Sequence, residues 1–290
     1  MFSDILTPIK AAGIPLHFAE KKGPVLERTV RNDEELKYLD ADFDATVATA
    51  HVREILTTLR KEIDGPIRAT RGADAPALLG FAGAPFTLAS YLIEGGTSKK
   101  FELTKGAIFA HSDFFGRLCD RLTEITIRYL KMQIDAGADA VQIFDSWAGI
   151  LGAADYQEFA GNYTARIIAA LREYSDAPVI LFVGNSAHLL PEMLQQNPTV
   201  LGLDWRVRIP ELRAALAQNT TTTAVQGNLD PLTLYGTPER VRQATTRVLA
   251  AFKEVRQERG YVYNLGHGIH PGSPIENVQA MIDTVRAYRD

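Results

Sequence analysis

Five side chains that could take part in catalysis or binding lie close to the ends of short apolar runs of the sequence. They are a carboxylate, two aromatic rings, a hydroxyl and an imidazole: Asp4, Phe81, Tyr91, Ser146 and His267. Four of them fall within a few residues of the carboxyl end of a predicted strand, and Tyr91 lies a helical turn further on. In a (β/α) barrel such strand ends face one mouth. The spacing therefore predicts that these residues converge, although it does not name a reaction.

The elements that would position them are strands alternating with helices. Buried strands are predicted at residues 77–82, 140–144, 179–183, 200–203, 224–226 and 261–264, with a strand fragment at Phe2. Helices are predicted at residues 5–12, 46–63, 87–94, 101–134, 156–174, 188–196, 209–218 and 237–257, with a last helix after a capping box at 273–276. The helix at 46–63 is expected to carry Val47 on its apolar face and to end at Gly65-Pro66, and the helix at 237–257 to begin with Thr237 as its N-cap. The apolar residues of the 101–134 segment that are expected to face inward are Leu118, Leu122, Ile125, Tyr129 and Met132. Residues 15–45 are expected to form a long loop or a short hairpin.

This alternation predicts a single α/β domain over residues 1–290 with a parallel sheet. An eight-stranded (β/α) barrel, the TIM barrel, would lack its first strand and part of its second. Periodicity alone also allows an open doubly wound sheet. No Gly-x-Gly-x-x-Gly turn follows a predicted strand, which disfavours the usual nucleotide-binding version of that fold.

Composition excludes several classes of protein. The chain has 46% apolar and 23% charged residues, and no run approaches the ~20 apolar residues that span a bilayer. The net charge of −4 argues against general nucleic-acid binding. Cys119 is the single cysteine, which excludes an internal disulfide and a thiolate-rich metal site. The start of the chain has no basic region or cleavage signal, so a cytoplasmic protein is expected.

Each candidate residue also has an ordinary structural interpretation. Asp4 could cap the helix that follows it, Tyr91 could be a core aromatic, and Ser146 could close a turn. Lys99 and Lys100 could be a solvated pair in a mobile loop. His267 and His270 have i,i+3 spacing, but no cysteine or acidic residue accompanies them, so a metal site is not predicted. The other histidines are expected to be surface or packing residues: His17, His51, His111 and His188. The residues alone leave these alternatives open.

Four stretches, in this order along the chain, resemble one known family. They read Phe2-Ser3-Asp4-Ile5-Leu6, FAGAPFTLASYLIEGG from Phe81, Gln142-Ile143-Phe144-Asp145-Ser146-Trp147-Ala148-Gly149 and Asn264-Leu265-Gly266-His267-Gly268. This pattern resembles the uroporphyrinogen decarboxylases from the first residues to the last helix. The resemblance implies a cytoplasmic, homodimeric TIM-barrel enzyme of haem biosynthesis that acts on a tetrapyrrole and needs neither a cofactor nor a metal.

The resemblance also assigns roles to residues. Asp4 would be catalytic: it would accept hydrogen bonds from the four pyrrole N–H groups and stabilise the cation formed when a pyrrole carbon is protonated. Tyr91, the second catalytic residue, would reach both the substrate and Asp4. Phe81, Ser146, His267 and Lys99 would bind substrate, the last three through its carboxylates. Asp145 would be structural, and Arg206 is a weaker candidate for neutralising the acidic substrate.

One part of the family pattern has no counterpart in the sequence. An Arg-Gln-Ala-Gly-Arg-Tyr motif, whose arginines bind substrate carboxylates in the family, is not reproduced in residues 1–80. The chain is therefore expected to be N-terminally truncated relative to the family, through a truncated gene or a misplaced start, or to be a natural product with impaired activity. The alternative functions are a corrinoid-linked methyltransferase of the same superfamily and an inactive porphyrinogen-binding fragment.

Overall fold

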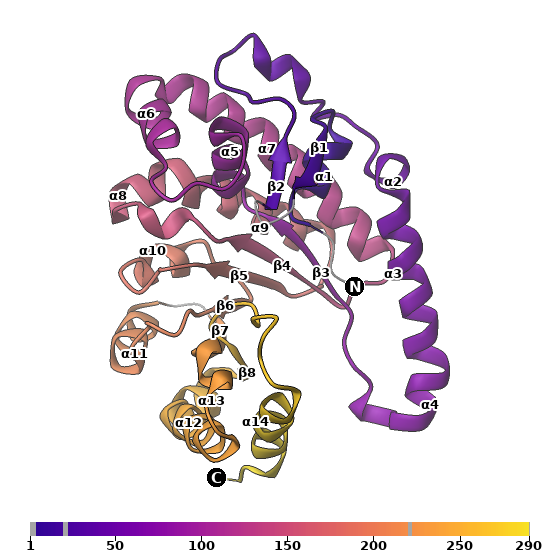
Figure 1. Cartoon of the computed structure of the whole chain (residues 1–290), viewed down its shortest axis with the longest axis vertical. Coiled ribbons are helices and arrows are strands. Elements are labelled where there is room, and N and C mark those ends of the chain that lie inside the picture. Colours follow the sequence, from indigo (N-terminus) through magenta and orange to yellow (C-terminus); the bar gives the residue numbers. More distant parts are fainter. Residues whose placement is uncertain (1–3, 20–22, 220–221, 290) are drawn as a thin grey trace. The chain divides into compact units, whose positions relative to one another are not determined.

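The computed structural model describes residues 4–19, 23–219 and 222–289 (Figure 1). The strand fragment predicted at Phe2 lies outside these residues. The chain forms two compact units. The first comprises Met1–Ser146 and Ala154–Val179, and the second comprises Trp147–Ala153 and Ile180–Asp290.

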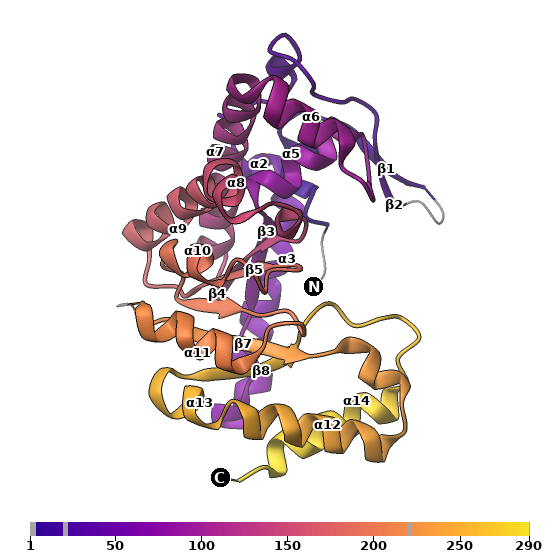
Figure 2. The same ribbon diagram turned by 90° about the vertical axis from the view of Figure 1, so that its left-hand side faces the viewer.

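The first unit is built on the parallel pair β3 (Leu79–Gly83) and β4 (Ala140–Asp145), in a register that places Leu79 opposite Ala140. The long helix α7 (Ser112–Asp135) packs against β3, and α5 (Pro85–Glu94) and α9 (Asn162–Tyr174) pack against α7 (Figure 2). The predicted inward face of α7 is confirmed, because all of its apolar members are buried: Leu118, Leu122, Ile125, Tyr129 and Met132.

The predicted hairpin is formed by β1 (Leu16–Ala19) and β2 (Gly23–Leu26), which pair antiparallel. Its outgoing strand is fixed to the end of α5, since Leu26 donates its backbone N–H to the Gly95 carbonyl at 3.3 Å. The other helices of this unit are α1 (Thr7–Ala11), α2 (Ala45–Ala48), α3 (Ala50–Glu62), η2 (Ile63–Ile67), α4 (Arg68–Arg71), η1 (Glu35–Tyr38), η3 (Gly72–Asp74), α6 (Glu102–Ala110), α8 (Ala153–Tyr156) and η5 (Gln157–Gly161).

Two predictions for residues 46–75 were wrong. The helix predicted at residues 46–63 is divided at Thr49, whose non-helical backbone (φ −118°, ψ 34°) separates α2 from α3, and Val47 is 72% exposed. The predicted stop at Gly65-Pro66 does not end the helical path. These residues lie in the wide π-turn η2, and α4 follows directly. A wider turn tolerates the missing N–H of Pro66 and relieves the clash of its ring with the preceding turn.

Four strands in consecutive parallel ladders belong to the second unit, except that Val179, the first residue of β5, is counted in the first: β5 (Val179–Val183), β6 (Val200–Gly202), β7 (Ala224–Leu229) and β8 (Tyr261–Leu265). All residues of β5 and β6 are buried, as their unbroken apolar runs predicted. The helices of this unit are η4 (Ala148–Ile150), α10 (Leu190–Gln195), α11 (Ile209–Gln218), η6 (Pro231–Tyr235), α12 (Pro238–Ala251), α13 (Lys253–Arg259) and α14 (Ile275–Ala287). Helices α12 and α14 pack against each other (Figure 1).

One predicted cap in the second unit is confirmed and the other is wrong. The Thr237 side chain accepts a hydrogen bond from the Arg240 N–H at the start of α12. At α14 the N-cap is Pro274, and the buried Ser273 hydroxyl has no partner among the described residues, so the capping box does not form. Strands thus alternate with helices in both units, and the α/β class with parallel strands is confirmed.

Candidate active site

Asp4 lies in the short loop that enters α1. Its Oδ1 accepts a hydrogen bond from the Leu6 N–H at 2.8 Å, and its carbonyl oxygen accepts one from the Thr7 N–H at 3.0 Å. The carboxylate therefore supports the first turn of the helix, as the ordinary interpretation predicted. Partial burial nevertheless raises the pKa of Asp4, while the Leu6 hydrogen bond opposes that shift. Oδ1 of Asp4 is thus hydrogen-bonded to the backbone, and Oδ2 takes no part in that hydrogen bond.

Tyr91 lies on the largely buried helix α5. This helix begins at Pro85 and ends at Glu94, and it is capped by Gly95, which has the left-handed φ of +84° that favours glycine. All of its residues from Pro85 to Ser90 are buried. Burial, and secondly the negative charge of Asp4, raise the pKa of Tyr91 to about 12. The structure thus brings Asp4 and Tyr91 within electrostatic reach, and the phenol keeps its proton at neutral pH.

Phe81 and Ser146 belong to neighbouring strands of the first unit. The backbone of Phe81 is bracketed by the Gln133 side chain, which accepts from its N–H at 2.8 Å and donates to its carbonyl at 2.9 Å. The half-buried ring of Phe81 packs edge-on against Phe144, with centroids 5.9 Å apart. Ser146 is half-buried in the turn that follows β4. Phe81 thus lies two residues before the end of β3 and Ser146 directly after the end of β4, so both are near the carboxyl ends of two paired parallel strands.

Asp145, next to Ser146, is completely buried. Its Oδ1 accepts a hydrogen bond from the Thr87 hydroxyl at 2.7 Å, and the Thr87 N–H contributes a second bond. Its Oδ2 has no hydrogen-bond partner among the described residues. Burial raises the pKa of Asp145 to about 7, and the bonds from Thr87 oppose that shift. This carboxyl group joins the end of β4 to the first turn of α5, the helix that carries Tyr91.

The raised pKa of Asp145 makes stability fall as the pH rises. An unfolded aspartate titrates near pH 4, so between about pH 4 and pH 7 the folded chain keeps a proton that the unfolded chain has lost. The resulting loss of unfolding free energy is at most roughly 4 kcal/mol. In Asp145→Asn the amide oxygen can still accept from Thr87 and cannot ionise. We expect denaturant unfolding at pH 5 and pH 8 to show a smaller loss for Asp145→Asn than for the unsubstituted chain. Equal losses would contradict this prediction.

Lys99 is exposed in the loop between α5 and α6, and both ends of this loop are fixed. Ser98 accepts a hydrogen bond from the Phe101 N–H at 3.0 Å, and Glu94 accepts from the N–H and hydroxyl of Thr104 at 2.9 Å. Lys100 lies within 3.4 Å of Glu102, with both side chains strongly exposed, so that pair contributes little stability.

His267 lies in the second unit, in the loop after β8, and is exposed. Its ring packs edge-on against Phe182 and Trp205, with centroids 6.3 and 6.2 Å away. The two flanking glycines differ in importance. A Cβ at Gly266 would overlap the backbone nitrogen of Trp205, whereas a Cβ at Gly268 would meet no atom within 4 Å. Close packing therefore requires a glycine at the position of Gly266 and does not require one at the position of Gly268.

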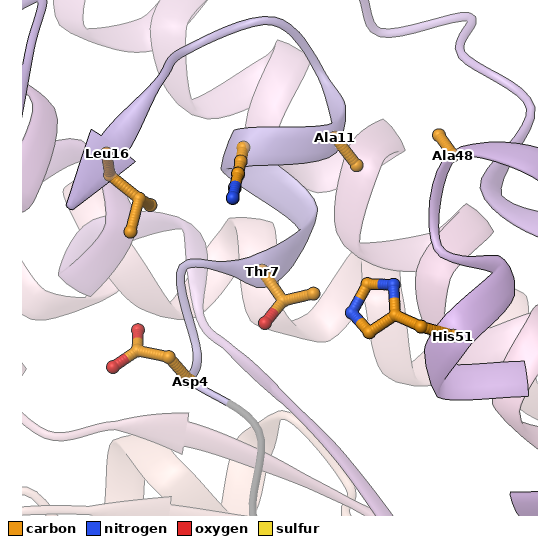
Figure 3. Close-up of a pocket in the computed structure, with 7 residues that line it drawn as sticks. Asp4, Thr7, Ala11, Leu16, Ala48 and His51 are labelled. Atoms are coloured by element: carbon orange, nitrogen blue, oxygen red, sulfur yellow. The ribbon is translucent and has the colours of Figure 1, made fainter. Parts of the chain in front are cut away.

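A pocket of about 840 Å³ opens beside Asp4 (Figure 3). It is lined by Asp4, Thr7, Lys10, Ala11, Leu16, Ala48 and His51. In Figure 3 the His51 ring extends toward Thr7, while the Asp4 carboxylate points away from that ring. Sequence reasoning predicted only surface or packing roles for His51 and did not consider Lys10. No motif marked these two residues, because they come from separate helices and meet only in the folded chain.

The described residues contain no group of three or more histidine, cysteine or acidic side chains arranged to hold a metal ion. Among the same residues, no helix combines the length and the apolar character needed to cross a membrane.

Comparison with known proteins gives a consistent result. The family model for uroporphyrinogen decarboxylase matches residues 1–288. A uroporphyrinogen decarboxylase of Psychrobacter is 38% identical over 290 residues, covering all of this chain and 76% of that protein. The enzyme of the same name from Gloeobacter violaceus is 39% identical, covering 99% of this chain and 78% of that protein. The chain is thus similar to these proteins over almost its whole length and spans about three quarters of theirs.

Similar solved structures are more distant in sequence. A methyltransferase from Methanosarcina mazei superposes with a TM-score of 0.73 over 98% of this chain and 78% of that chain, at 18% identity. A B12-independent methionine synthase from Shewanella superposes with a TM-score of 0.54 over 94% of this chain and 74% of that chain, at 13% identity. At such low identity the likeness shows a shared fold and nothing about the reaction.

Proposed function

Because this chain belongs to the uroporphyrinogen decarboxylase family, we propose that it removes CO₂ from the four acetate side chains of uroporphyrinogen III. The product is coproporphyrinogen III, an intermediate of haem biosynthesis. The enzyme is then a carboxy-lyase that acts without a cofactor. The observation that supports the proposal is the electrostatic proximity of Asp4 and Tyr91, since the negative charge of Asp4 adds to the effect of burial in raising the pKa of Tyr91.

The chemistry of the reaction explains why a carboxylate suits this position. Loss of CO₂ leaves an electron pair on the former acetate carbon, and that pair must be delocalised. Protonation of a pyrrole carbon makes the ring cationic, so the ring accepts the electron pair when the bond to CO₂ breaks. A proton then reaches the methylene carbon, and the pyrrole carbon loses the proton it gained. Overall each acetate and one proton give one methyl group and one CO₂.

Asp4 stabilises the charge that appears only along this path. An ionised carboxylate is purely an acceptor, which suits four pyrrole N–H donors and a ring that turns cationic. An interaction that strengthens as the cation forms raises the rate of the chemical step. Tyr91 remains protonated at neutral pH and donates a hydrogen bond to the substrate or to Asp4 at the edge of the site.

The remaining predicted residues bind the substrate. Phe81 contacts the macrocycle, and Ser146 donates a hydrogen bond to a side-chain carboxylate. His267 supplies a hydrogen-bond donor, and Lys99 supplies donors and positive charge, to the same class of group. The exposure of Lys99 and His267 supports this assignment, since a ligand can reach both.

Three broader features are also part of the proposal. Residues 1–290 act as one barrel domain of the uroporphyrinogen decarboxylase type. The working enzyme is a homodimer located in the cytoplasm. The family resemblance supports these features, and size measurement in solution tests the dimer directly.

The test is the anaerobic incubation of the 290-residue chain with uroporphyrinogen III. We expect the release of four CO₂ per macrocycle, with products carrying seven, six, five and finally four carboxylates separated by chromatography. The same preparation should convert substrate at an unchanged rate after dialysis against a chelator. Binding of the porphyrinogen without CO₂ release would overturn the proposal in favour of a binding-only relative.

A further inference from the structure

A second charged cluster lies in the second unit, directly after β6. Its centre is Asp204, whose side chain is 1% exposed. Oδ1 accepts a hydrogen bond from the Arg206 N–H at 2.7 Å. Oδ2 accepts from the Asn185 N–H at 2.7 Å and from Nη1 of Arg206 at 3.1 Å. Two backbone donors therefore already satisfy this buried carboxylate, and the guanidinium group is not its only partner.

The Arg206 side chain is held between Asp204 and an aromatic ring. Its guanidinium carbon lies 3.9 Å from the centroid of the Trp205 ring, which is within range of a cation–π contact. The side chain remains 49% exposed. Asp204 is its one acidic partner within 4 Å among the described residues. A guanidinium has five N–H donors in a planar fork, so most of them stay available to a ligand.

The backbone around this arginine is fixed from two neighbouring strands. The Asn228 side chain at the end of β7 donates hydrogen bonds to the carbonyls of Asp204 and Val207, at 3.0 and 3.2 Å. At the end of β8, Gly266 packs so closely on Trp205 that a side chain there would overlap it. These contacts hold the loop that carries Arg206 from two sides, so less conformational entropy is lost when a ligand binds to it.

His267 contacts the same indole ring that Arg206 covers. The His267 and Trp205 rings meet edge-on, at an interplanar angle of 85°. Trp205 thus supports two nitrogen-bearing side chains, one from the loop after β6 and one from the loop after β8. Both side chains are accessible, and both donate hydrogen bonds to anions.

We propose that Arg206 and His267, supported by Trp205, form a binding subsite for a side-chain carboxylate of the macrocycle. The inference rests on the proposed function and extends it to Arg206 as a substrate-binding residue. A carboxylate matches the planar fork of the guanidinium, and a substrate with eight carboxylates needs local positive charge on a protein whose net charge is −4. During any one decarboxylation step, the carboxylate bound at this subsite is not the one that is lost as CO₂.

The test compares Arg206→Gln with the matched control Arg208→Gln. Arg208 is two residues away and also pairs with an acid, Glu211 at 3.0 Å, but it is strongly exposed and contacts no aromatic ring that the structure records. Uniform binding energy appears in KM and not in kcat. We expect Arg206→Gln to raise KM for uroporphyrinogen at least tenfold while kcat stays within threefold. Arg206→Lys should raise KM by a smaller factor, and Arg208→Gln should leave both constants unchanged.

Calorimetric titration with uroporphyrin I, a stable planar octacarboxylate, gives a second reading that does not require turnover. The dissociation constant should rise at least tenfold in Arg206→Gln alone, with an unchanged melting temperature. An unchanged dissociation constant would overturn the subsite. So would a fall in melting temperature large enough to explain the weaker binding by unfolding of the variant.

The two proposals can fail separately. If the unsubstituted chain binds the probe through Arg206 but releases no CO₂, the proposed function fails and the subsite stands. If Arg206→Gln turns over with the KM of the unsubstituted chain, the subsite fails and the proposed function stands.

Discussion

Asp4→Asn should lower the turnover of uroporphyrinogen by about a thousandfold or more, because it removes the charge that stabilises the cationic pyrrole. Loss of one electrostatic group aimed at developing charge commonly costs two to three orders of magnitude. Here the group faces a full positive charge and meets several N–H donors. Asparagine also places an N–H₂ group where those donors need an acceptor. Anaerobic assays at saturating substrate measure the effect on kcat.

The substitution at Asp4 has a close control in the same unit. Asp40 accepts a hydrogen bond from the Asp42 N–H at 2.9 Å, the same i to i+2 bond that Asp4 makes with Leu6, but Asp40 is exposed. Asp40→Asn should keep the rate and the melting temperature of the unsubstituted chain. Because asparagine can still accept the Leu6 bond, Asp4→Asn should remain folded. A folded Asp4→Asn protein with near-normal turnover would refute the mechanism.

Gly149→Ala should be among the most destabilising single methyl additions in the chain. A Cβ at this position would overlap the Gly184 carbonyl oxygen and lie 2.7 Å from that of Asn185. Both obstacles are backbone atoms, so no rotation of a flexible side chain can relieve the clash. We expect a loss of about 3 kcal/mol in unfolding free energy, the upper end of the usual cost of overpacking. The melting temperature should fall by roughly 5–10 °C in a thermal scan.

Gly152, three residues further on, serves as the control. A Cβ there would meet no atom within 4 Å. Gly152→Ala should therefore change stability by no more than about 1 kcal/mol, and a small gain is reasonable because alanine restricts the unfolded chain. Similar melting temperatures for the two variants would show that the backbone around Gly184 yields to the added methyl group.

Much of the fold followed from local patterns in the sequence. Residues 179–183 and 209–218 were predicted with the bounds that the structure has, because an unbroken apolar run and a Pro-initiated amphipathic segment are strong local signals. The errors came where tertiary packing changed a local rule. The local rule predicts a helix stop at Pro66, but a π-turn accommodates this residue. Val47 matched the predicted apolar stripe, but the break at Thr49 moved it out of phase.

The candidate site was located by motifs, and its chemistry depends on contacts that motifs do not show. The family pattern identified Asp4 and Tyr91, and their electrostatic coupling required the folded chain. Their catalytic roles stay predictions. Asp145 was interpreted as structural, but nothing in the sequence revealed that one of its oxygens is buried without a partner among the described residues. Lys10 and His51 could not be found at all, because they come from α1 and α3 and line one pocket only once α1 packs against α2, the helix that precedes α3.

The position of Cys119 has a consequence for the redox behaviour of the protein. This single thiol is completely buried in α7, and burial together with the nearby carboxylates Asp145 and Asp120 raises its pKa well above the usual range. Oxidants and alkylating reagents attack the thiolate, which this environment suppresses. The folded chain therefore offers no readily oxidised cysteine. A loss of activity under air should be traced to the porphyrinogen, which oxygen converts to a porphyrin, and not to the thiol of the enzyme.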